Sequence, residues 1–390
     1  MVTSVQTTNE QLLEGAKRIG QLAEQEADRA EKTASISENV VNLMKETGIT
    51  RIMLPKEYGG PQTDLRTFAE IVRTVSYYNV SAGWLTYLYP LHNVLPAYLP
   101  KKGRDEIINQ GGLICDVFAA VGTCAKDGDG WRVNGAWKYA SGVLFSDWIG
   151  LGVNVELPGY DKPQVCLAML KKEEVEIVCD WDTFGLRGTG SNQVIAKNVY
   201  CPNERLLNLT YADTVGQPPD AYDDPDYPLY NVPFYPAFYL GFPYMALGGA
   251  KRVLDEFKTQ TESRVRLMDG GIRESQSPRG QRVLAEMTTD YLAADSLMTK
   301  YLDLLEQTRH GAKVKRAEFF ALRTRAIKLC VDIAVRAFTT LGGAAMYKGN
   351  VIELFLRDIL GVATHKTSLY EDAVAAFGKE LFGYDSFVRG

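Results

Sequence analysis

The stretch Arg357-Asp358-Ile-Leu-Gly-Val-Ala-Thr-His365-Lys366, near the C-terminus, says most about the fold and the chemistry of this chain. It follows a long region of helical periodicity and ends in a basic pair, His365 and Lys366. The window 362–369 contains no Asp or Glu. The ionisable side chains that this window offers are the imidazole of His365 and the ammonium group of Lys366.

Along the rest of the chain, three regions differ in the spacing of their apolar residues. Apolar residues recur at helical spacing up to about residue 113 and again from Ala246, whereas the region between them has short alternating runs separated by Gly and Pro. Helices, then strands, then helices predict an α+β fold. The expected parts are an N-terminal α-helical domain (1–113), a central β-barrel or sandwich domain with a substrate-side loop (114–235) and a C-terminal four-helix bundle (236–390).

Two details of the middle region carry expectations of their own. Residues 131–139 alternate around Asn134-Gly135, a dipeptide that predicts a hairpin turn. The bridge 211–244 is rich in Tyr, Phe, Pro and Asp. Its rings could stack on an aromatic substrate or pack between the β-domain and the helices, and the sequence leaves both open.

Composition excludes several classes of protein. Among 390 residues, 46% are hydrophobic and 23% charged, enough for a large core. A net charge of −5 argues against nucleic acid or an anionic membrane as the partner. No run reaches the roughly 18 apolar residues of a membrane helix, and the polar N-terminus does not resemble a secretory signal.

The cysteines and histidines give expectations about the redox state of the thiols and about metal binding. The six cysteines are scattered with no CxxC, which predicts reduced thiols and a cytoplasmic protein. The three histidines, at 92, 310 and 365, show no metal-ligand spacing, so no metal site is expected.

Five local motifs occur along the chain, and each is weak by itself, because core aromatics, a glycine-rich turn, a solvated helix face or a helix terminator would explain it. They are Pro55-Lys-Glu-Tyr-Gly-Gly60 with Ser81-Ala-Gly-Trp84 and His92, Trp137-Lys-Tyr-Ala-Ser141-Gly142, Gly185-Leu-Arg187-Gly-Thr189-Gly-Ser191, Arg264 and Arg266 before Gly270-Gly271, and Thr339-Thr-Leu-Gly342-Gly343.

The order and spacing of these motifs resemble the acyl-CoA dehydrogenase fold from about residue 10 to 383. They are more similar to its oxygenase branch, the two-component (group D) flavin-dependent monooxygenases. Two departures from the dehydrogenases favour that branch. The window 362–369 lacks the family's glutamate base, and 118–124 replaces its Glu-Pro-Gly-x-Gly-Ser loop.

The resemblance implies roles for residues around the flavin ring. Trp84 and His92 are expected at the edge of the flavin and substrate cavity, and Ser141 at the N5 edge. Arg187 and Thr189 belong to a loop near the flavin, where the Arg187 cation would stabilise negative charge.

Four further residues are expected on the phosphate side of the cofactor: Arg266, Thr339, Gly342 and Gly343. In dehydrogenases an Arg at this place reaches the cofactor of a neighbouring subunit, and paired glycines permit close approach to phosphate. Here the family's Arg-x-x-Phe-Gly has lost its aromatic residue, and Thr339 replaces a Gln. These departures leave FAD and FMN both open.

The implied function is that of an oxygenase component which hydroxylates a small aromatic or polycyclic substrate. Reduced flavin (FADH2 or FMNH2) comes from a separate NAD(P)H-flavin reductase and reacts with O2 through a C4a-(hydro)peroxyflavin. His365 is predicted to be the acid–base residue, with His92 and Ser141 as further catalytic groups. Family members are usually homotetramers, built as dimers of dimers, and the same is expected here.

Three alternatives stay open at this point. One is a dehydrogenase of acyl-CoA or acyl-carrier thioesters with a relocated base such as Glu371. Another is a monooxygenase of the same fold that oxidises nitrogen or sulfur. The third is a degenerate flavoprotein kept as an assembly partner.

Overall fold

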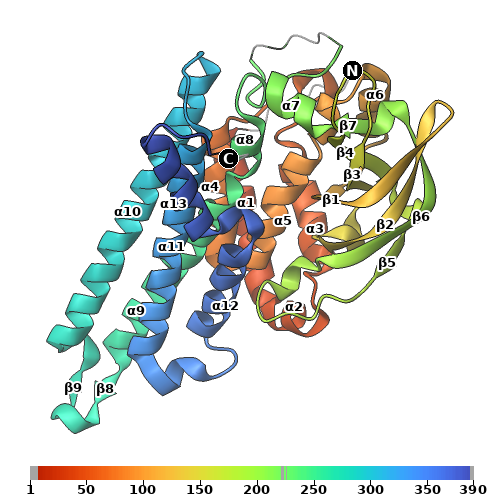
Figure 1. Ribbon diagram of the computed structural model, residues 1–390. Coiled ribbons are helices and arrows are strands. Elements are labelled where there is room, and N and C mark those ends of the chain that lie inside the picture. Colours follow the sequence, from red (N-terminus) through yellow and green to blue (C-terminus); the bar gives the residue numbers. More distant parts are fainter. Residues whose placement is uncertain (1–7, 221–223, 225, 387–390) are drawn as a thin grey trace.

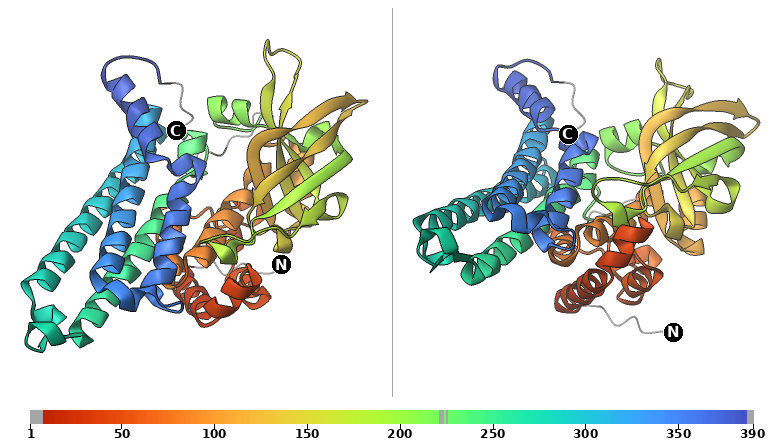
Figure 2. Two further views of the ribbon diagram at one scale, coloured as in Figure 1. Left: turned by 60° about the horizontal axis from the view of Figure 1, so that its bottom comes forward. Right: turned by 90° about the horizontal axis from the view of Figure 1, so that it is seen from below.

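The computed structural model describes residues 8–220, 224 and 226–386 (Figure 1). The first seven and last four residues of the predicted end domains lie outside this part. Helices near the N-terminus occupy the middle of the molecule, with the β-sheet on one side and the C-terminal bundle on the other, and the further views agree (Figure 2). The N-terminal helices are α1 Asn9–Gln25, α2 Ala27–Thr33, α3 Glu38–Glu46, α4 Leu65–Tyr78, α5 Val80–His92 and α6 Lys101–Gln110.

Helix α5 is the central element of the N-terminal part. All of its 13 residues are buried, as expected for a helix that is apolar all round. Asn79 caps its start by accepting a hydrogen bond from the backbone N–H of Ala82. The helix runs through Pro90 to His92 and contacts α4, α9 and β1. It thus carries Trp84 and His92 on one continuous element between the sheet and the bundle.

The β-domain is one seven-stranded sheet folded on itself, in the order β5-β6-β2-β1-β3-β4-β7. The long β1 pairs with β3 through its first half and with β2 through its second, and β4 also contacts β6. The fold therefore encloses a separate apolar core, centred on the buried Trp137. The strands are β1 Ile114–Asp127, β2 Gly130–Ala140, β3 Trp148–Val155, β4 Gln164–Lys171, β5 Glu176–Val178, β6 Asn192–Pro202 and β7 Leu206–Asn208.

The predicted hairpin turn at Asn134-Gly135 is wrong. Strand β2 continues through this dipeptide, and the chain turns between β1 and β2 at Gly128, whose φ is +57°. The pairing of β2 with β6 shifts by one register between Val133 and Gly135. Gly135 leaves room for the ring of Trp137, since a Cβ there would lie 2.7 Å from that ring. Packing inside the sheet therefore overrides the local turn propensity.

The C-terminal bundle continues the core of the N-terminal helices, because buried residues of both parts form one apolar cluster. Helix α11 contacts α9, α10, α12 and α13. Residues Arg316–Met346 are apolar enough to cross a membrane by length and composition only, and in the fold they form this inner helix. The elements are α7 Leu209–Val215, α8 Phe234–Phe238, α9 Gly241–Ser263, β8 Val265–Arg266, β9 Ile272–Arg273, α10 Pro278–Arg309, α11 Arg316–Leu341, α12 Val351–Thr364 and α13 Tyr370–Leu381.

The α+β prediction of helical, sheet and helical parts is confirmed by this element order. The predicted domain boundaries stay predictions. The first falls just before β1, and the second falls within α8.

Candidate active site

A chain of buried hydroxyl groups lies where the β-domain meets α5. The indole N–H of Trp84 donates to Ser141 Oγ at 3.1 Å, and this oxygen lies 2.7 Å from Ser191 Oγ. Ser191 Oγ lies 2.6 Å from Thr189 Oγ1, which donates to the carbonyl of Leu186 at 2.9 Å. Each hydroxyl has one proton, so these contacts are all satisfied when every hydroxyl donates toward Leu186.

Strand pairing and a buried carboxylate position this chain. Ser141 follows the last residue of β2 and Ser191 precedes the first residue of β6, and these two end residues are paired in the sheet. Asp358 of α12 accepts a hydrogen bond from the backbone N–H of Leu186 at 2.7 Å and lies 3.4 Å from the hydroxyl of Ser81. Burial raises the pKa of Asp358 to about 7. The Arg-Asp pair of the C-terminal stretch thus serves to hold the hydroxyl loop.

The ring of His365 packs against the ring of Trp84. Its ring stacks on Phe242, with centroids 4.5 Å apart, and meets Trp84 edge-on at 5.7 Å. Trp84 and Phe242 are 5.2 Å apart, so the three rings form one cluster. Helices α5 and α9 and the end of α12 each supply one of them. The structure therefore brings together His365, Trp84 and Ser141, as the sequence predicts.

The protonation state of His365 follows from its neighbours. Its Nδ1 accepts from the backbone N–H of Thr367 at 3.3 Å and lies 2.8 Å from the hydroxyl of Thr367, which places the ring proton on Nε2. Burial, and then the charge of Arg323, lower the pKa of His365 to about 4. The imidazole is neutral at pH 7 and can donate through Nε2.

His92 ends α5 and meets a carboxyl group of β1. Its Nε2 lies 3.1 Å from Asp116 Oδ2, and both side chains are less than one-tenth exposed. Burial lowers the pKa of His92 to about 3 and raises that of Asp116 well above its usual range. Burial thus opposes the charged form of each group at the end of α5.

The surroundings of Ser141 suit a flat aromatic cofactor. Tyr139 has a φ of +71°, an uncommon conformation for a bulky residue, and its ring is 67% exposed. It meets Trp181 edge-on at 6.1 Å. Hydroxyl groups that can donate or accept, with exposed rings beside them, form a donor set that fits the edge and face of an isoalloxazine. Together with the fold, this site defines the class of a flavin-dependent oxidoreductase.

Arg187 lies in the same loop as Thr189 but is engaged elsewhere. Its guanidinium donates to the carbonyl of Glu31 at 2.7 Å, to Asp182 at 2.5 Å and to the carbonyl of Thr183 at 3.0 Å. These contacts tie the loop to α2. A role of Arg187 toward the flavin stays a prediction.

The predicted phosphate-side residues form a second group at the far end of the bundle (Figure 1). Arg266 pairs with Glu274 at 3.0 Å, Thr339 is exposed, and a Cβ at Gly342 or Gly343 would meet no atom within 4 Å. The hairpin and the end of α11 are neighbours, because Arg264 donates to the carbonyl of Leu341. Within one protomer, the β8–β9 hairpin lies apart from strands β2 and β6 (Figure 1).

The alternative dehydrogenase base does not lie in the site. Glu371 is exposed at the start of α13, and its neighbour Asp372 pairs with Lys366 at 3.1 Å. Sequence reasoning did not single out Asp116 or Arg323. It quoted Ser191 within a motif and included Phe242 in the aromatic bridge, without a separate role for either. The available signals were an acid inside an apolar strand and a base at an apolar position of a helix.

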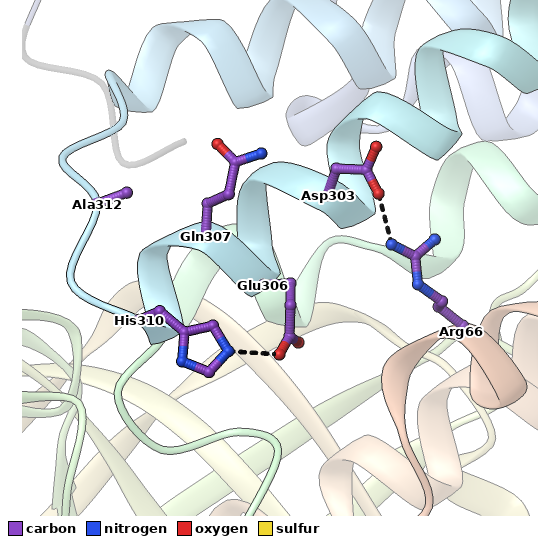
Figure 3. A pocket seen from close by; sticks show the side chains of 6 residues that line it. All are labelled: Arg66, Asp303, Glu306, Gln307, His310 and Ala312. Carbon is purple, nitrogen blue, oxygen red and sulfur yellow. Dashed lines mark hydrogen bonds and ion pairs between the residues drawn. The ribbon is translucent and has the colours of Figure 1, made fainter.

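A hollow of about 450 Å³ lies elsewhere on the surface, lined by Arg66, Asp303, Glu306, Gln307, His310 and Ala312 (Figure 3). His310, the third histidine, lies 3.0 Å from Glu306 there and is largely exposed. This hollow shares no residue with the candidate site.

Comparisons with known proteins agree with the class of flavin-dependent oxidoreductases. A model of the acyl-CoA dehydrogenase N-terminal domain matches residues 8–108, and one of the C-terminal domain matches 240–368. The flavin-dependent monooxygenase oxygenase subunit HsaA of Rhodococcus jostii (strain RHA1) is 26% identical, over 92% of this chain and 94% of its own. The oxygenase component of p-hydroxyphenylacetate 3-hydroxylase from Acinetobacter baumannii is 24% identical, over 96% and 89%.

A solved structure shows the same fold. XiaF from a Streptomyces species, in complex with FADH2 and glycerol, aligns with a TM-score of 0.88 over 97% of both chains, at 20% identity. This chain belongs to the acyl-CoA dehydrogenase family, among the oxygenase components of flavin-dependent monooxygenases.

Proposed function

We propose that this protein hydroxylates an aromatic small molecule with reduced flavin and dioxygen, supplied with flavin by a separate NAD(P)H-flavin reductase. The ring cluster of Trp84, Phe242 and His365, joined through Trp84 to the hydroxyl of Ser141, carries the proposal. It combines aromatic faces, which suit a ring substrate, with a neutral imidazole. A relative named for p-hydroxyphenylacetate supports an aromatic substrate.

The groups that would hold the flavin ring are the hydroxyls of Ser141 and Thr189 and the rings of Trp84 and Tyr139. When bound, reduced flavin supplies the two electrons with which one atom of dioxygen enters the substrate and the other leaves as water. Ser141 receives the hydrogen bond of Trp84, so its own O–H can turn from Ser191 to an acceptor on a ligand. The buried rings exclude water from this place.

His365 would handle the proton of the reaction. Its Nε2–H would donate a hydrogen bond to an oxygen atom of the ligand, while the backbone N–H of Thr367 holds Nδ1 as an acceptor. His92, held by Asp116, would offer a second neutral imidazole. These roles explain why both histidines are buried without charge.

The test replaces His365 by Ala in the full-length protein. General acid–base help of this kind is worth about 10² to 10⁴ in rate, so product formation should fall by at least about 10²-fold. Binding of reduced flavin should persist, and oxygen consumption should continue with release of hydrogen peroxide. Product, peroxide and anaerobic flavin binding are measured together.

His310→Ala is the matched control, because it removes the exposed histidine of the surface hollow, whose lining includes no residue of the ring cluster. It should leave coupled turnover unchanged. Unchanged product yield in the His365 variant would remove this residue from the mechanism. An acceptor-dependent oxidation of acyl thioesters without oxygen would instead establish a dehydrogenase.

We also propose assembly as a homotetramer, a dimer of dimers built through the bundle. Exposed apolar side chains at the bundle end support this, since Leu267 is 83% and Met268 97% exposed. They lie beside Arg266, whose predicted phosphate contact would then be made to a neighbouring protomer's cofactor. The scattered free cysteines suit the cytoplasm, where NAD(P)H is available to the reductase.

A further inference from the structure

Arg323 is a cation buried in the interior, and no described residue gives it a carboxylate partner. It lies on α11 and is 1% exposed. Its Nε and Nη2 both donate to the carbonyl of Thr367, at 3.1 and 2.9 Å. Its Nη1 has no hydrogen-bond partner in the part of the chain that the structure describes. One edge of this guanidinium is thus used by the backbone, and the hydroxyl of Tyr301, which interacts with the cation, does not satisfy Nη1.

A buried charge of this kind is costly unless a counter-charge compensates it. Arginine does not escape this cost by losing its proton. The rings of Phe320 and Tyr239, 4.6 and 5.1 Å from the guanidinium carbon, offset part of it. Burial lowers the pKa of Arg323, whereas Tyr301 and Tyr239 oppose this. A neutral side chain could donate a hydrogen bond to the carbonyl of Thr367 equally well. These hydrogen bonds therefore do not explain why a positively charged residue is buried here.

Arg323 borders the candidate active site on the side of His365. Thr367, which accepts its two hydrogen bonds, also caps the imidazole Nδ1 of His365. Tyr239, over which the guanidinium lies, packs against Phe242 at 6.2 Å, and Phe242 stacks on His365. The cation and the imidazole therefore flank the same group of rings.

We propose that Arg323 recognises a carboxylate carried by the aromatic substrate. The inference rests on the proposed function and narrows its substrate class to aromatic acids. A carboxylate is charged at pH 7 and accepts from a guanidinium at short range, whereas a phenol is neutral there and would first have to ionise. The leftover Nη1 donor and the missing counter-charge are what such a group supplies.

The experiment measures binding to the full-length protein with reduced FMN or FAD, under anaerobic conditions, by calorimetry. The probes are 4-hydroxyphenylacetate and its uncharged amide, 4-hydroxyphenylacetamide. The wild type should bind the acid at least about tenfold more tightly than the amide. Arg323→Met should abolish this difference, and Arg323→Lys should keep part of it. Thermal unfolding of each variant verifies that it folds.

Arg325→Met is the matched control, because Arg325 lies on the same helix, is exposed and stacks on Tyr370. It should keep the preference for the acid. Equal binding of acid and amide by the wild type, or no binding of the acid, would overturn the proposal without any variant. A loss of both ligands in Arg323→Met would assign the residue to structure alone.

Failure of this inference can be told from failure of the proposed function. Coupled oxidation of a neutral phenol by the wild type, with no preference for acids, would overturn the role of Arg323 and leave the monooxygenase standing. Absence of oxygen-dependent product from charged and neutral aromatics alike would count against both.

Discussion

At the scale of single residues, the site is built from buried groups that are kept neutral in pairs. His92 and Asp116 face each other at 3.1 Å, and burial moves their pKa values in opposite directions. A neutral pair keeps hydrogen-bonding capacity in an apolar place without the cost of two buried charges. His365 has a different neighbour, since burial and then the positive charge of Arg323 lower its pKa to about 4.

This pairing predicts how stability depends on pH. The lowered pKa of His92, about 3 against an ordinary 6.5, contributes stability that is present above pH 6.5 and is lost as the pH falls. The raised pKa of Asp116 acts oppositely, since its contribution is lost as the pH rises above 3.8. Between these values the two contributions have opposite signs in the wild type.

The variant Asp116→Asn should reveal how His92 alone makes the free energy of unfolding depend on pH. The free energy of unfolding of this variant should rise with pH between 3.8 and 6.5 more steeply than that of the wild type, by at most about 1.4 kcal/mol per pH unit. Urea unfolding at several pH values measures this. A slope equal to that of the wild type would show that burial does not lower the pKa of His92.

At the scale of elements, the β-domain depends on glycines that admit Trp137. A Cβ at Gly122 would lie 2.0 Å from the ring of Trp137 and 2.9 Å from the carbonyl of Asn134. The indole N–H donates to the carbonyl of Gly152 at 2.8 Å, which holds the ring across the bent strand β1. The strands that end at Ser141 and Ser191 thus rest on this packing.

Gly122→Ala should therefore destabilise the protein by roughly 1–3 kcal/mol, as overpacking of a filled core does. Gly378→Ala is the counterpart, because a Cβ there meets nothing within 4 Å and the residue lies inside α13. It should be neutral or stabilise by about 0.5–1 kcal/mol. Urea unfolding measures the free energy of unfolding of both variants. Equal values for the two would refute the packing argument.

At the scale of the whole molecule, two apolar cores meet at the site. One is shared by the N-terminal helices and the bundle, and the other belongs to the β-domain. Trp84 belongs to the first core and hydrogen-bonds to Ser141 beside the second. The bundle leaves apolar side chains exposed at its far end, where the β8–β9 hairpin lies (Figure 1).

Placing charges in this hairpin should weaken the proposed assembly. The double variant Leu267→Glu, Met268→Glu puts two carboxylates where an apolar contact is expected, so the mass in solution should fall below that of a tetramer. Light scattering after gel filtration measures it. Val121→Glu, at an apolar residue 64% exposed on the sheet, is the control and should not change the mass. An unchanged mass for the double variant would place the interface elsewhere.

The sequence by itself determined the order of helices and strands, since helical and alternating periodicities are local. It also determined that the window after α12 carries His365 and no acid. Its motifs pointed to Trp84, Ser141 and Thr189, which the structure brings together with His365.

Only the tertiary structure decided which polar groups meet and which are left alone. It brought His92 to Asp116, added Phe242 to the rings, and left Nη1 of Arg323 without a hydrogen-bond partner among the residues that the structure describes. It also replaced the expected turn at 134–135 by a continuous strand. Local propensity cannot reveal these features, because each arises from contacts between segments far apart in the chain, and burial at those contacts sets both the charge state and the backbone path.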